Sequence, residues 1–121
     1  MKGMVESSFI GYNLSMEAKS LDYMIAEQIM GWSIIEQEGG KKAWTENGVI
    51  IFFASKFKPS RDLASMRTVI HKMRKDGYML HLIAEPELFK AKFTRWPYGL
   101  KTWQEATTME MAIAKGALSW L

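Results

Sequence analysis

One segment near the N-terminus constrains the fold more than any other part of the chain. From Leu21 to Trp32 the sequence reads LDYMIAEQIMGW. Its apolar residues recur every three or four positions, the spacing that places side chains on one side of an α-helix. Gly31 can adopt the left-handed conformation that ends a helix, and Trp32 can then fold back onto the last turn. The segment predicts a helix that ends at Met30. Its core residues are predicted to be Leu21, Met24, Ile25 and Ile29.

The composition predicts one globular domain. A chain of 121 residues can build one domain with a core but is short for two. The absence of cysteine excludes disulfides, thiolate catalysis and cysteine-bound zinc. No apolar run reaches the ~18 residues that a membrane helix needs, and the first ten residues lack the apolar core of a secretory signal. We therefore expect a cytosolic protein that does not bind membranes.

Three short strands are expected after the first helix. Asn47-Gly48 is the strongest hairpin signal in the chain, and Gly39-Gly40 marks a second tight turn. The last of these strands contains the run Val-Ile-Ile-Phe-Phe, which predicts a strand that is buried, or nearly so, on both faces. The three predicted strands are residues 32–37, 42–45 and 49–54.

A second helix is expected to begin after Pro59 and to end at Asp76-Gly77. Ser60 is its predicted N-cap, with Asp62 in the first turn. Strands at 78–84 and 88–95 follow. The second of these alternates between lysines on one face and Phe89, Ala91 and Phe93 on the other, which is typical of an antiparallel strand with one wet face.

The third helix is expected to open at Thr107, because Thr107 and Glu110 match a capping box. Its predicted core residues are Ala114, Ala117, Leu118 and Leu121. The resulting order is αβββαββα, an α+β domain with a mostly antiparallel sheet of about five strands layered with three helices. Residues 1–19 are predicted to be an N-terminal arm, residues 20–121 the domain, and the first helix to start near Glu17 or Ser20.

No sequence motif predicts catalysis or metal binding. Nucleotide-binding glycine motifs, paired metal-binding histidines and serine-nucleophile motifs are absent from the sequence. His71 falls, by helical spacing, beside Arg67 and Arg74, which would repel a metal ion. His81 lies within a predicted strand, where an ordinary structural role is the simpler interpretation. We therefore expect no catalytic residues, no metal and no cofactor, and hence no enzyme.

Two basic stretches are the candidate ligand site. Lysine and arginine side chains supply charge for phosphate, aromatic rings supply faces for stacking, and a helix N-terminus offers free N–H groups. The alternative interpretation is a solvated sheet face with a loop anchored by a tryptophan. The residues predicted to bind an anionic, nucleotide-like molecule are Lys58, Ser60 and Arg61 at the second helix, and Lys90, Lys92, Arg95, Trp96 and Tyr98 at the fifth strand.

Four segments of the chain resemble the phage ABA sandwich domain family. The stretch from Leu21 to Trp32 is similar to that family's opening helix, which typically reads Leu-Asp-x-Leu-Ile-Ala-Glu-x-Ile/Val-Met-Gly-Trp. Residues 58–64 resemble its entry to the second helix, residues 73–78 the exit from that helix, and residues 112–118 its C-terminal helix. The likeness covers roughly residues 20–121, and the chain departs from the pattern at 96–102 and in the first 19 residues. It implies a small protein of a phage or prophage, with helices layered on a sheet and no catalytic residues.

Small accessory proteins of phages often act against host defence, and by this analogy we expect the same here. The first hypothesis is a non-enzymatic protein of the host bacterial cytoplasm that sequesters a nucleotide-derived signalling molecule. It would act as a homo-oligomer whose interface completes the pocket. The alternative is an inhibitor that binds a host defence protein through an exposed surface, since ten methionines and five tryptophans suit adaptable contacts. A third hypothesis is nucleic-acid binding by the basic residues of the second helix and fifth strand.

Overall fold

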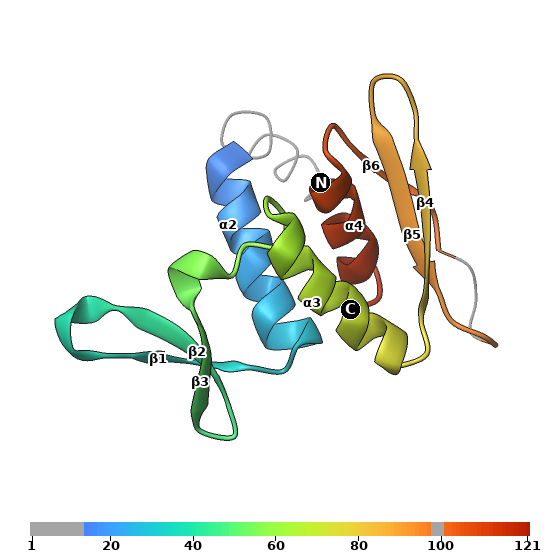
Figure 1. Cartoon of the computed structure of the whole chain (residues 1–121). Coiled ribbons are helices and arrows are strands. Elements are labelled where there is room, and N and C mark those ends of the chain that lie inside the picture. Colours follow the sequence, from blue (N-terminus) through green and yellow to red (C-terminus); the bar gives the residue numbers. More distant parts are fainter. Residues whose placement is uncertain (1–13, 98–100) are drawn as a thin grey trace, which may run out of the picture.

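Three helices separate two small antiparallel sheets in the computed structural model, which describes residues 14–97 and 101–121 (Figure 1). One sheet lies at the lower left of Figure 1 and the other on the right, with the helices in the centre. The helices are α2 (Leu14–Met24), α3 (Leu63–Lys75) and α4 (Met109–Leu118). The first sheet has β1 (Ser33–Glu36), β2 (Lys42–Glu46) and β3 (Val49–Phe53), and the second has β4 (Met79–Ala84), β5 (Phe89–Thr94) and β6 (Gln104–Ala106).

The α+β class is confirmed, but the prediction of one five-stranded sheet is wrong. The described strands form two sheets of three, in the orders β1-β2-β3 and β4-β5-β6, and the element order is αβββαβββα. The missed strand, β6, consists of only three residues, Gln-Glu-Ala, and carries no alternating apolar signal. Strand β6 is defined by its pairing with β5, in which Glu105 lies opposite Lys90, and this contact between distant segments leaves no local signal in the sequence.

The first helix begins earlier than predicted, and its last turn is π-helical. Helix α2 starts at Leu14 and continues into a π-helical turn, Ile25–Ile29, in which the Met30 N–H donates to the Ile25 carbonyl at 3.0 Å. A π-turn spaces hydrogen-bonded residues by five and so shifts the side chains out of the α-helical register. Ile25 is fully buried, as predicted, whereas Met24 is 41% exposed and does not belong to the core. Leu21 and Ile29 are partly buried.

The predicted helix end is confirmed. Gly31 has a φ of +73°, and across it the Trp32 N–H donates to the carbonyl of Ala26 at 3.0 Å. The Trp32 ring is buried and packs edge-on against Phe57, with ring centroids 4.9 Å apart. The segment therefore directs the chain out of the helix and into β1.

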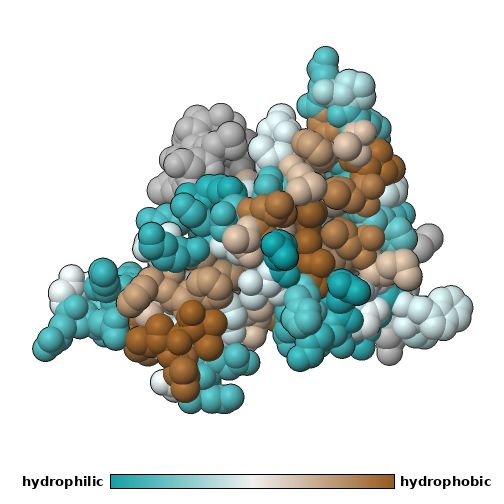
Figure 2. Space-filling view, in the orientation of Figure 1, coloured by the Kyte–Doolittle hydropathy of each residue, from teal (hydrophilic) through white to brown (hydrophobic). Residues whose placement is uncertain are grey.

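The first sheet is buried at its central strand and exposed along its edges. The predicted turns are present, with positive φ at Gly39, Gly40, Asn47 and Gly48. The prediction that the third strand is buried on both faces is wrong, because β3 lies at the sheet edge and Val49 is 62% exposed. Figure 2 shows a hydrophobic patch over this sheet at the lower left. The central strand β2 carries the core contact, its Trp44 being 1% exposed.

The second sheet packs tightly on α4. The alternation predicted for β5 is confirmed, since Ala91 and Phe93 are fully buried and belong to the core. Gly116 permits the close approach, because a Cβ there would lie 3.4 Å from the Cα of Lys92. The Trp120 Nε1–H donates to the carbonyl of Phe93 at 2.9 Å, which ties the end of the chain to this sheet.

Two details of α4 differ from prediction. The N-cap is Thr108 rather than Thr107, and its Oγ1 accepts from the Met111 N–H at 3.2 Å. Leu121 is 59% exposed and therefore lies outside the core. The buried residues of the helix are Ala112, Ile113, Ala114, Gly116 and Ala117.

A buried carboxylate links α2 to the turn that precedes α3. Asp22 is 2% exposed, and its Oδ1 accepts from the Ser60 N–H at 2.7 Å. Its Oδ2 accepts from Arg61 Nη2 at 3.0 Å and from Nε at 3.3 Å. Burial raises the pKa of Asp22, while the hydrogen bonds from Ser60 and Arg61 act in the opposite direction. Ser60 adds a further link, since its hydroxyl donates to the Ala18 carbonyl at 3.3 Å.

Replacing Asp22 is expected to destabilise the fold strongly. Asp22→Ala leaves the Ser60 N–H buried without an acceptor and removes the partner of Arg61, so we expect a loss of about 2–3 kcal/mol in the free energy of unfolding. Asp22→Asn keeps an acceptor for Ser60 and should lose less. Urea unfolding measures both variants, with Glu27→Ala, an exposed change in the adjoining π-turn, as the control. Equal stability of Asp22→Ala and the control would contradict this role.

Candidate functional site

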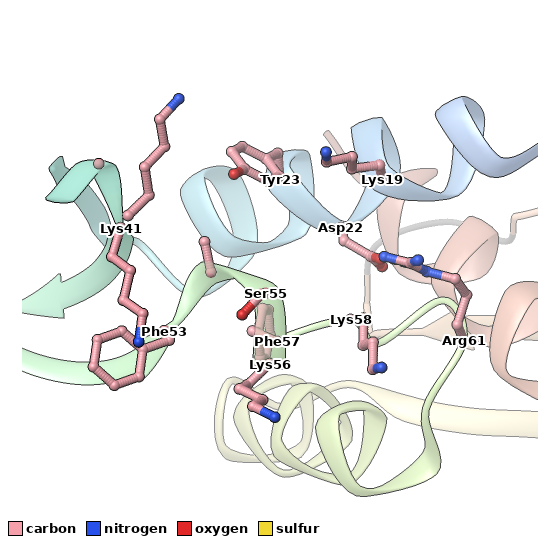
Figure 3. A pocket seen from close by; sticks show the side chains of 13 residues that line it. Lys19, Asp22, Tyr23, Lys41, Phe53, Ser55, Lys56, Phe57, Lys58 and Arg61 are labelled. Carbon is pink, nitrogen blue, oxygen red and sulfur yellow. Dashed lines mark hydrogen bonds and ion pairs between the residues drawn. The ribbon is translucent and has the colours of Figure 1, made fainter.

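A basic cleft of about 610 Å³ opens between α2, the start of β2 and the segment that joins β3 to α3 (Figure 3). We call it the basic cleft. Helix α2 contributes Lys19 and Tyr23, and the chain after β3 contributes Ser55 and Phe57. The cationic residues that line it are Lys19, Lys41, Lys42, Lys56, Lys58 and Arg61.

The charge of the basic cleft is strongly one-sided. Among the described residues that line it, six are cationic and one, Asp22, is anionic. Asp22 is buried and bonded to Arg61, which also lines the cleft, so these two charges balance each other. No ion pair found among residues 14–97 and 101–121 joins Lys19, Lys42 or Lys56 to a carboxylate. The cleft therefore presents positive charge to solvent.

Two aromatic rings are positioned to contact a bound molecule. Phe53 is 40% exposed, and the ammonium of Lys41 lies 5.1 Å from its ring centroid. Tyr23 is partly buried and packs edge-on against Trp44 at 5.1 Å. Phe57 also lines the cleft, but it is 2% exposed and belongs to the core. Phe53 and Tyr23 are thus the rings on which a flat group could rest.

The N-terminus of α3 is already capped by a carboxylate. The predicted N-cap, Ser60, is wrong: Asp62 is the N-cap, and its Oδ2 accepts from the Ser65 N–H at 3.0 Å and from the Ser65 hydroxyl at 2.9 Å. These bonds lower the pKa of Asp62. Ser60 is buried, and its amide and hydroxyl both donate to α2. It therefore positions the turn instead of presenting donors to a ligand.

The fifth-strand residues of the predicted site belong to the second sheet. Lys90 pairs with Glu85 at 3.3 Å and with Glu105 at 3.9 Å. The Lys92 ammonium lies 4.5 Å from the centroid of the Trp103 ring. Both lysines are thus engaged by neighbours on their own sheet, and neither lines the basic cleft.

The remaining predicted residues are dispersed around the end of β5. Arg95 stacks on Tyr78, its guanidinium 5.1 Å from the ring centroid, and Trp96 is 91% exposed. Tyr98 lies outside the described residues. Of the predicted residues that the structure describes, only Lys58 and Arg61 line the basic cleft.

Sequence reasoning missed most of the basic cleft. Lys19, Tyr23 and Phe53 gave no local signal, because they come from segments that meet only in the folded chain. The pair Lys41-Lys42 could have been noticed, since two adjacent lysines follow a tight glycine turn.

Neither histidine lies in the basic cleft. The Nε2 of His81 is 2.9 Å from the Thr94 hydroxyl on the neighbouring strand. His71 lines an open hollow on α3 together with Arg67 and Arg74. Within the described ranges, no group of three or more metal-binding side chains is found. In the same ranges, no helix has the length and apolar character needed to cross a membrane.

The fold is similar to that of a phage protein from Bacillus cereus of known crystal structure. The TM-score is 0.59 with 18% sequence identity, over 86% of this chain and 91% of that chain. At this identity the likeness establishes a shared fold. No family model and no curated protein matches the sequence. The resemblance to the phage ABA sandwich family therefore stays a prediction.

The capping role of Asp62 predicts a pH effect on stability. Because its folded pKa is lowered from 3.8, Asp62 stabilises the fold above the unfolded pKa, and this contribution is lost as the pH falls through the folded pKa. Asp62→Asn keeps a capping oxygen but cannot ionise. We expect the stability of the unmodified chain to fall relative to Asp62→Asn as the pH is lowered below about 4. Urea unfolding at a series of pH values measures the difference, and parallel curves would contradict it.

Proposed function

We propose that this chain is a phage-encoded accessory protein that captures a nucleotide-derived anion in the basic cleft. The observation that carries the proposal is the charge of the cleft lining. Six of its described side chains are cationic, and its one carboxylate, Asp22, is already paired with Arg61. A volume near 610 Å³ is within the range of about 300–1,000 Å³ that is usual for small-molecule sites. The phage origin is supported by the fold shared with the Bacillus cereus phage protein.

The lysines and the aromatic rings suit different parts of such a ligand. Lys41, Lys42 and Lys56 are exposed, and their flexible ammonium groups can follow the several oxygens of a phosphate group. Phe53 and Tyr23 offer ring surface for a base. A duplex nucleic acid would need a basic surface that follows its phosphates over a longer distance. The concave shape of the cleft therefore favours a small anion over a polymer.

The side chains of the basic cleft support binding without turnover. Asp22 is buried and fully engaged, and no histidine is among the described residues that line the cleft. Histidines and free carboxylates are the commonest general acids and bases, and the described lining of the cleft offers neither. We therefore infer a non-enzymatic protein that withdraws a signalling molecule from a host defence in the bacterial cytoplasm.

Neutralising two of the cleft lysines is expected to weaken ligand binding. Lys41→Gln with Lys56→Gln removes two cations from the basic cleft, and we expect affinity to fall about tenfold or more for a phosphate-bearing ligand. Lys90→Gln with Lys92→Gln removes the same charge from the second sheet and serves as the matched control. Calorimetry against cyclic mononucleotides, cyclic dinucleotides and ADP-ribose derivatives measures both variants.

Recovery of the bound nucleotide unchanged after denaturation would support capture without turnover. Absence of binding across the panel would overturn the proposal. A loss of binding in the Lys90/Lys92 variant instead would move the site to the second sheet. An affinity for oligonucleotides that falls steeply with salt would favour nucleic-acid binding.

A second candidate function, direct inhibition of a host defence protein, is favoured by exposed apolar side chains near the second sheet. Met79 is 61% exposed and Trp96 is 91% exposed. Large exposed rings and methionines are enriched at protein contacts. Such a surface gives a protein partner a place to bind that is independent of the basic cleft.

Trp96→Ala tests this second candidate. If Trp96 anchors a partner, the change should reduce co-purification of one host protein by tenfold or more, because buried tryptophans dominate interface energies. The complex should resist nuclease treatment and moderate salt. Lys41→Gln with Lys56→Gln is the control and should leave co-purification unchanged. Retention of the partner by Trp96→Ala would contradict this role.

A further inference from the structure

Strand β3 is an open edge of the first sheet. It pairs with β2 on one side, and no further backbone hydrogen bond to Val49–Phe53 is found among the described residues. An open edge presents a row of N–H and C=O groups that can pair with another strand. This edge belongs to the sheet beneath the hydrophobic patch of Figure 2. Backbone groups and apolar side chains are thus available in the same place.

The sequence of β3 has neither the charged residues nor the proline that protect many edge strands. Edges are commonly guarded by charged residues or proline, yet β3 reads Val-Ile-Ile-Phe-Phe. The opposite edge, β1, ends in Glu36. A register shift in the β2–β3 pairing leaves Ile51 without a partner on β2, and Ile51 is 40% exposed. This bulge twists the strand but does not cover it.

We propose that β3 pairs with β3 of a second copy of this chain, antiparallel and about a twofold axis near Ile51. The two three-stranded sheets would join into one sheet of six. In this arrangement Val49 of each copy lies opposite Phe53 of the other, and the same surface is used twice, as a twofold interface requires. Main-chain hydrogen bonds supply the pairing, and the apolar side chains bury each other.

Charges on β2 that flank the two ends of β3 favour this partner and this direction. Glu46 pairs with Val49 at one end, and no ion pair found in the described part of the chain involves Glu46. At the other end Lys42 precedes the partner of Phe53, and Lys41 lies over the Phe53 ring. Antiparallel pairing of two copies places the acidic end of each strand beside the basic end of the other. Parallel pairing would place like charges together.

The contact is small, which favours a weak dimer. A five-residue strand pair buries less than the ~800 Å² per partner of a typical stable complex, so the dimer should be weak and dependent on concentration and salt. The inference does not rest on the nucleotide ligand, because it uses the sheet edge alone. Phe53 nevertheless also lines the basic cleft, so the second copy would lie close to the cleft mouth.

Sedimentation of the full chain at about 1–500 µM tests the dimer. The unmodified chain should dimerise with rising concentration, and Ile51→Lys should weaken dimerisation at least tenfold by adding a charge to the strand centre. Ile35→Lys is the matched control, since Ile35 has a similar exposed fraction, 42%, and lies on the opposite edge strand. Val49→Lys, at a more exposed position, repeats the test should Ile51→Lys fail to fold.

Charge exchange provides a test that does not depend on the apolar side chains. Glu46→Lys should weaken dimerisation, and combining it with Lys42→Glu should restore it, because the attraction between the ends is then reversed on both copies. A chain that stays monomeric at every concentration would overturn the proposal. So would equal loss of dimer in Ile35→Lys and Ile51→Lys, which would indicate contact through the sheet face instead of the β3 edge.

Discussion

The basic cleft depends on one buried interaction, the contact of the Asp22 carboxylate with the turn before α3. Transfer of a carboxylate from water to the protein interior costs several kcal/mol unless hydrogen bonds compensate. Here the compensation comes from the Ser60 N–H and the Arg61 guanidinium. Because both donors belong to the same turn, the contact fixes the path of the chain from β3 to α3 against α2. That path carries Lys56 and Lys58, so the positions of two cleft lysines follow from it.

The same contact explains why Arg61 differs from the lysines around it. Asp22 holds the Arg61 guanidinium from one side, and the Arg61 side chain is 46% exposed. A planar guanidinium held in this way is a fixed donor, whereas an ammonium on a four-carbon stem adapts its position. The basic cleft therefore combines a rigid cationic wall with a mobile lysine rim.

Features set by local backbone physics could be predicted from the sequence. The end of α2 at Gly31, the hairpin at Asn47-Gly48 and the alternation along β5 each depend on a few adjacent residues, and all are present. Features that depend on distant partners could not. Examples are the π-turn at Ile25–Ile29 and the exposure of β3, which reflects its place at an edge.

The candidate site was only half predictable for the same physical reason. A sequence shows that Lys58 and Lys90 are both basic, but it does not show which carboxylates reach them. On the second sheet Lys90 lies between Glu85 and Glu105, so its charge is largely balanced where it stands. In the basic cleft the corresponding carboxylate, Asp22, is buried and bonded to Arg61 and to the Ser60 N–H. An anion is attracted by charge that remains uncompensated, and the cleft offers five lysines that take part in no ion pair found among the described residues.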